Sequence, residues 1–71
     1  MNGPKEWTII FYDEYGEGID IDMMHMGEPD VLIQAFLDLE SNPEAVKVII
    51  HRTTDEGKAG MPFAVINKVV S

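Results

Sequence analysis

The chain has 71 residues, enough for one domain, and 45% of them are hydrophobic, a share too high for a disordered segment. It contains no cysteine, which excludes disulfide bonds and thiolate zinc sites, and no apolar run approaches the ~18 residues of a transmembrane helix. Thirteen acids and five bases give a formal charge of −8. We expect a cytoplasmic protein without a secretory signal, because the first residues include no long apolar stretch.

The charge is unevenly distributed along the sequence. Residues 1–44 contain eleven acids and one base, a net charge of −10, whereas residues 45–71 contain two acids and four bases, a net charge of +2. Nucleic acid phosphates and anionic membranes repel such a chain, so we expect neither as a direct partner. A basic surface on another protein attracts it, and the composition therefore favours a protein partner.

The first third of the chain predicts a β-hairpin. Residues 7–12 are rich in β-branched and aromatic side chains, which favours a strand, and the polar residues 13–18 include two glycines, which is typical of a turn. Residues 19–23 alternate strictly between apolar and acidic side chains. In this second strand we expect Ile19, Ile21 and Met23 to face the core. Asp20 and Asp22 would then point to solvent.

A helix is predicted to begin within residues 27–30 and to extend to about residue 40. Proline is tolerated in a first helical turn, and acids there interact favourably with the helix dipole. The predicted buried stripe consists of Leu32, Ala35, Phe36 and Leu39, flanked by Val31 and Ile33. Leu37 falls toward the polar side of this helix. Pro43 ends the helix, because the residue before a proline avoids helical geometry.

Two further strands are predicted at residues 45–52 and 62–70, joined by a polar loop at 53–61 into a second hairpin. Pro62 stands at the start of the last strand, where its missing N–H group costs little. We therefore expect residues 1–71 to form a single α+β domain of the order ββαββ. It would contain a four-stranded, mainly antiparallel sheet with one helix packed on one face. The order of the strands in the sheet is left open.

One helix leaves the other face of such a sheet uncovered. The strand residues expected on that face are the apolar Ile10, Tyr12, Ile49 and Ile66 and the polar or charged Asp20, Asp22, Lys47, His51 and Lys68. An apolar centre with a charged rim is typical of a protein interface. Scattered apolar residues are also normal on a protein surface, so both interpretations stay open.

The acids and histidines of the chain fit no recognisable metal motif. Asp20 and Asp22 share one side of a strand and could bind a metal ion or divide acid and base roles, but the alternation of this strand favours a solvated side. His25 lies near Glu28 and Asp30 in the sequence, but this spacing matches no known set of ligands. We expect no metal and no cofactor.

The remaining candidates for chemistry are equally weak. His51 ends a predicted strand and has no recognisable nucleophile to activate. The segment of residues 57–60 contains two glycines and a lysine but lacks the spacing of a phosphate-binding loop. We therefore expect no catalytic residues and no enzymatic activity.

The sequence favours a non-enzymatic protein-binding domain. The leading hypothesis is an acidic inhibitor that occupies a basic, nucleic-acid-binding surface of a partner protein, because closely spaced carboxylates can imitate the phosphates of DNA. The expected partner-binding residues are Asp13, Glu14, Glu17, Asp20, Asp22, Tyr12, Ile10, Ile49 and Leu37.

Two alternatives stay open. The first is a structural or regulatory homodimer formed through the open sheet face, because a domain this small gains stability from a second subunit. The second is a small metal- or ligand-binding domain, although a pocket of several hundred Å³ is hard to accommodate in so short a chain.

Overall fold

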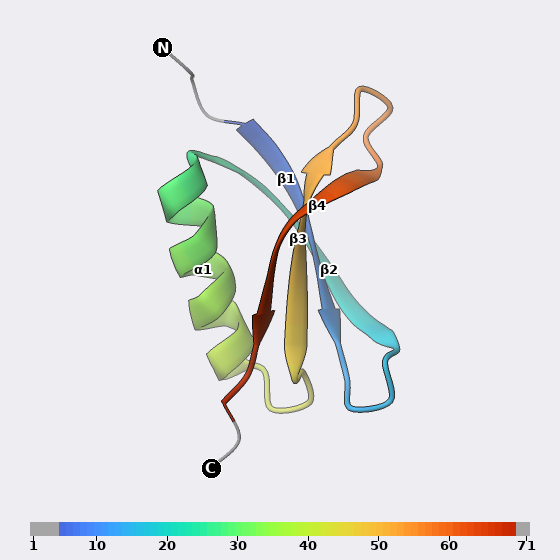
Figure 1. Cartoon of the computed structure of the whole chain (residues 1–71), viewed down its shortest axis with the longest axis vertical. Coiled ribbons are helices and arrows are strands. Elements are labelled where there is room, and N and C mark those ends of the chain that lie inside the picture. The colour runs from blue at the N-terminus through green and yellow to red at the C-terminus, as the bar shows by residue number, and fades with distance from the viewer. Residues whose placement is uncertain (1–4, 70–71) are drawn as a thin grey trace.

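Four strands and one helix follow one another in the order ββαββ in the computed structural model, which describes residues 5–69. The elements are β1 (Lys5–Tyr12), β2 (Gly18–Met26), α1 (Glu28–Ser41), β3 (Lys47–Thr53) and β4 (Ala59–Asn67). Figure 1 shows α1 lying along one side of the twisted sheet. The predicted α+β fold with one helix on one sheet face is confirmed.

The strands are ordered β2-β1-β3-β4, and every neighbouring pair is antiparallel. The two hairpins therefore join through their first strands, β1 and β3, which form the centre of the sheet. The β1–β2 turn lies at the same end of the molecule as the end of α1, whereas the β3–β4 turn lies at the opposite end (Figure 1). β2 and β4 are the two edge strands.

The second hairpin has a shorter connection than the sequence indicates. β4 begins at Ala59, and residues 54–58 form a tight turn in which the Thr54 N–H donates to the Lys58 carbonyl at 2.8 Å. Gly57 adopts a positive φ of 81° there, which a glycine accommodates without strain. Pro62 lies inside β4 beside a register shift, not at its start. β4 ends at Asn67, and Val70 of the predicted strand lies outside the described residues.

The core fills the space between α1 and one face of the sheet. Its fully or almost fully buried apolar residues are Trp7, Ile9, Phe11, Val31, Ala35, Leu39, Ala45, Val48 and Ile50. The Trp7 indole N–H is satisfied by the main-chain oxygen of Met26 at 2.9 Å, so this large side chain is buried without an unpaired donor. β1 and β3 supply the sheet side of the core because they are the central strands.

The helix contacts the sheet along a different line from the predicted one. Val31, Ala35 and Leu39 are buried, whereas Phe36, predicted in the central stripe, is 47% exposed. Leu32 is only partly buried. Apolar residues cover more than half of the circumference of this helix, so periodicity alone does not select the contacting line. The small side chain of Ala35 at the centre of the observed line permits a close approach to the sheet.

The orientation predicted for β2 is wrong beyond its first residues. A register shift opposite Phe11 and Tyr12 places one extra residue, Ile19, in β2, and Ile19 packs against the core as predicted. Beyond this bulge the side chains of β2 face the opposite sides from those predicted. Asp20 and Asp22 pair with core residues of β1 and lie on the helix side of the sheet, exposed at its edge. Ile21 and Met23 lie on the open face and are 65% and 51% exposed.

The position of the helix predicts contrasting effects for two leucines that are two residues apart. Leu39→Ala should lower the free energy of unfolding by about 2–5 kcal/mol, because it leaves a cavity in the core. Leu37→Ala, at a side chain that is 53% exposed, should change it by less than about 1 kcal/mol. Urea denaturation followed by circular dichroism measures both values, and equal losses would contradict the observed helix orientation.

Candidate functional site

The open face of the sheet carries a continuous apolar row across all four strands. Ile21 of β2 lies opposite Ile10 of β1, Ile10 opposite Ile49 of β3, and Ile49 opposite Val65 of β4. Ile10 and Ile49 are partly buried by their neighbours, whereas Ile21 and Val65 at the two edges are 65% and 51% exposed. These four β-branched side chains, here called the aliphatic row, have no helix above them.

The row next to it on one side contains no Lys, Arg, Asp or Glu. It consists of Met23, Thr8, His51 and Pro62. The Thr8 hydroxyl hydrogen-bonds to the Thr53 hydroxyl at 2.8 Å, which satisfies a polar group that is almost completely buried.

On the other side of the aliphatic row, Lys47 lies beside Tyr12. The Lys47 Nζ stands 5.2 Å from the centre of the Tyr12 ring, within the range of a cation–π interaction. Glu6, near the start of β1, is the one acid among the described strand residues of the open face. The centre of this face therefore carries no carboxylate, although the chain as a whole has a charge of −8.

The structure divides the predicted partner-binding residues among separate surfaces. Ile10, Tyr12 and Ile49 lie together on the open face, as expected. The acids expected beside them do not: Asp13, Glu14 and Glu17 lie in or next to the β1–β2 turn, and Asp20 and Asp22 lie on the helix side. Leu37 projects from the exposed surface of α1.

Other residues expected on the open face are also displaced. Ile66 packs against the core on the helix side, because it pairs with the buried Val48. The Lys68 Nζ donates to the main-chain oxygen of Asn42, in the connection that follows α1. In their place, the open face contains Ile21, Met23 and Val65. The pairing register of the strands, and not the sequence pattern, places these three residues on the open face.

Acidic side chains gather instead around two adjacent hollows. The first, an open groove of about 390 Å³ between β2 and the end of α1, is lined by Phe11, Asp20, Asp22, Asp38, Ser41, Asn42 and Pro43. The second, of about 340 Å³, is lined by Asp13, Glu14, Tyr15, Pro43, Glu44 and Val46. Pro43 borders both hollows, so they are adjacent, and together they are called the acidic surface here.

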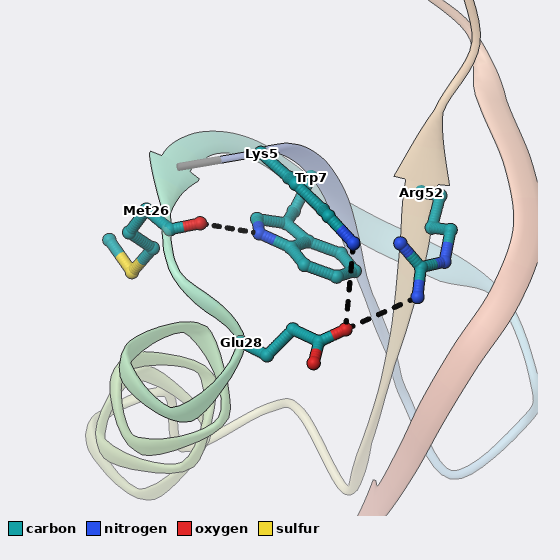
Figure 2. A network of polar contacts seen from close by, with 5 residues as sticks. All are labelled: Lys5, Trp7, Met26, Glu28 and Arg52. Carbon is teal, nitrogen blue, oxygen red and sulfur yellow. Dashed lines mark hydrogen bonds and ion pairs between the residues drawn. The ribbon is translucent and has the colours of Figure 1, made fainter. Parts of the chain in front are cut away.

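Lys68 reaches the rim of the first hollow, where its Nζ donates to the main-chain oxygen of Asn42, and the ion pairs of the described residues lie elsewhere. Figure 2 shows Lys5 and Arg52 converging on Glu28 at the start of α1, with N–O distances of 3.8 and 3.2 Å. The Arg52 guanidinium also lies 5.2 Å from the ring centres of Trp7 and Phe63. Within residues 5–69, every ion pair ends on Glu28. The carboxylates of the acidic surface therefore lack ion-pair partners in the part of the chain that the structure describes.

Three of these acids also have structural roles. One oxygen of Asp13 accepts hydrogen bonds from the N–H groups of Tyr15 and Glu17 at 2.9 and 3.0 Å and thereby orders the turn. Asp20 and Asp22 each accept the N–H group of the next residue at 3.0 Å, along the outer edge of β2. The sequence pattern did not predict this local role.

The described acids and histidines do not gather into a metal centre. No cluster of three or more His, Asp or Glu residues among residues 5–69 is arranged to hold a metal ion. The His51 Nδ1 lies 3.1 Å from the Gly60 carbonyl, which can only accept, so Nδ1 carries the proton in the neutral ring. The His51 Nε2 is buried and has no partner among the described residues.

Comparison with protein-family models, with curated proteins and with solved structures gives no match. In the described part of the chain, no helix combines the length and the apolar character needed to cross a membrane.

Proposed function

We propose that this protein is a non-enzymatic protein-binding domain whose main binding surface is the open face of its sheet. The observation that carries this proposal is the aliphatic row. Four β-branched side chains in register across four strands form one contiguous patch, and the helix covers only the other face. Contiguous apolar patches on a protein surface mark interaction sites far more often than single exposed side chains do.

The surroundings of the aliphatic row indicate the chemistry of the partner. Tyr12 and Lys47 border it on one side, and Met23 and Thr8 border it on the other. Tyrosine and methionine are enriched at protein interfaces. Because the acids lie on the helix side and in the turns, a partner on the open face does not need to be basic. The expected partner therefore presents an apolar, β-branched or aromatic protein surface.

Two changes of the same chemical type on opposite sides of the molecule test this proposal. Ile21→Lys places a charge in the aliphatic row, whereas Leu37→Lys places the same charge on the exposed side of α1. A charge buried at an interface without a partner should weaken binding by about tenfold or more. Each variant and the wild type are immobilised, and proteins captured from a lysate of the source cells are quantified by mass spectrometry.

The proposal predicts at least one protein that the wild type and Leu37→Lys both retain and Ile21→Lys loses. If a partner is instead lost with Leu37→Lys and kept with Ile21→Lys, the binding surface is α1 and the proposal is wrong. Circular dichroism of both variants checks that each is folded.

A second candidate function uses the acidic surface to occupy a basic surface of another protein, in the manner of an inhibitor that imitates nucleic acid. It is favoured by the groove in which Asp20, Asp22 and Asp38 converge without an ion-pair partner among residues 5–69. A lysine or arginine side chain of a partner could enter this groove.

Charge-matched variants separate a specific groove from a general effect of net charge. Asp20→Asn with Asp22→Asn removes two charges from the groove and keeps the oxygen that accepts the neighbouring N–H group. Asp55→Asn with Glu56→Gln removes two charges from the β3–β4 turn, at the other end of the sheet (Figure 1). Binding to an immobilised arginine-rich peptide should fall about tenfold in the first variant and little in the second, and it should weaken with salt. Equal losses in both variants would show that only net charge matters.

A further inference from the structure

The two edges of the sheet differ in how their main-chain hydrogen-bonding groups are protected. An edge strand presents unpaired N–H and C=O groups to which another strand can add, and proteins usually protect such edges with charges, proline or bulges. β2 carries Asp20, Asp22 and His25. β4 contains no charged residue between Ala59 and Asn67.

Two outward N–H groups of β2, those of Ile21 and Met23, are already occupied. The Val46 N–H donates to the Tyr12 carbonyl at 2.8 Å, which shows that Tyr12 directs its main-chain groups toward β3. By alternation, the main-chain groups of Phe11 and of its partner Asp20 bond to each other between β1 and β2. The main-chain N–H and C=O groups of the next residue, Ile21, therefore point outward from the edge of the sheet. The Asp20 carboxylate accepts that outward N–H group, and Asp22 does the same for Met23. β2 is therefore protected by its own side chains.

The corresponding groups of β4 have no such cover. The Lys68 N–H donates to the Val46 carbonyl at 2.8 Å, so the main-chain groups of Lys68 point toward the β3 side. By alternation the main-chain groups of Ile66 also point toward β3, whereas those of Val65 and Asn67 point outward. β4 is the last strand of the sheet, and no described side chain bonds to these outward groups. The uncovered stretch is residues 63–67, because Pro62 and the register shift beside it interrupt the start of the strand.

We propose that β4 pairs antiparallel with β4 of a second copy of this chain, about a two-fold axis at Val65. The Val65 N–H of each copy then donates to the Val65 carbonyl of the other, and Phe63 of one copy lies opposite Asn67 of the other. A two-fold contact brings identical residues together, which requires a strand without like charges. β4 meets that condition, whereas β2 would bring its own aspartates together.

The pairing also extends the open face. Val65 is both the midpoint of the uncovered edge and the last member of the aliphatic row. A two-fold axis at Val65 therefore joins the aliphatic rows of two copies into one row across eight strands, with both helices on the opposite face. The acids of β2 and of the β1–β2 turn are then distant from the contact, because β2 is the opposite edge of the sheet. This pairing stands on the edge geometry alone and does not depend on the proposed partner of the open face.

Sedimentation equilibrium over a range of protein concentrations tests the pairing with two matched variants. Val65→Lys and Ile21→Lys make the same type of change at the two ends of the aliphatic row. The wild type and Ile21→Lys should form a reversible dimer, and Val65→Lys should raise the dimer dissociation constant by about tenfold through like charges placed opposite each other. A wild type that stays monomeric at all concentrations overturns the proposal. So does equal weakening by both variants, which would indicate face-to-face packing.

A main-chain variant keeps the test independent of side-chain effects on folding. The chain is short enough for chemical synthesis with an N-methyl group on Val65, which removes the outward N–H donor and retains the valine side chain. This protein should remain folded by circular dichroism and should fail to dimerise. The same modification at Ile21, whose N–H is bonded to Asp20, should leave the dimer intact. Dimerisation of the N-methyl-Val65 protein would overturn the proposal.

Discussion

A single 14-residue helix can cover only one face of a four-stranded sheet, and the other features of this structure follow from that constraint. The covered face takes the large side chains of the central strands, including Trp7, Ile9 and Ile50. The uncovered face has no such protection, yet the aliphatic row crosses its centre where a solvated sheet would carry polar residues. This combination of a small core and an apolar open face is the physical basis of the binding proposals.

The sequence predicted those parts of the fold that depend on local chemistry. Pro43 located the end of the helix, β-branched runs located three strands, and the alternation of residues 19–23 located β2, because these signals act within a few residues. The sequence did not predict which face of the sheet each β2 side chain occupies, because the long-range pairing of the strands decides this. The bulge at Ile19 reverses the sides of Asp20 and Ile21, and only the register with β1 reveals it.

The same limit applies to the candidate site. Ile10 and Ile49 were predicted on the open face because strand alternation placed them there, and the structure brings them together. Ile21 and Val65 complete the aliphatic row, but the first was assigned to the core and the second was not selected. The segregation of charge was likewise invisible in the total of −8, because it depends on which side of β2 the aspartates lie.

The most direct test of this account measures which side chains of β2 and β3 water reaches. Methyl NMR spectra of a dilute sample, recorded with and without a soluble paramagnetic agent, report the exposure of each isoleucine separately. The account predicts strong broadening of the Ile21 methyl signals and almost none for Ile50, which is fully buried. Protection of Ile21 equal to that of Ile50 would contradict it, because Ile21 would then face the core and the aliphatic row would not exist.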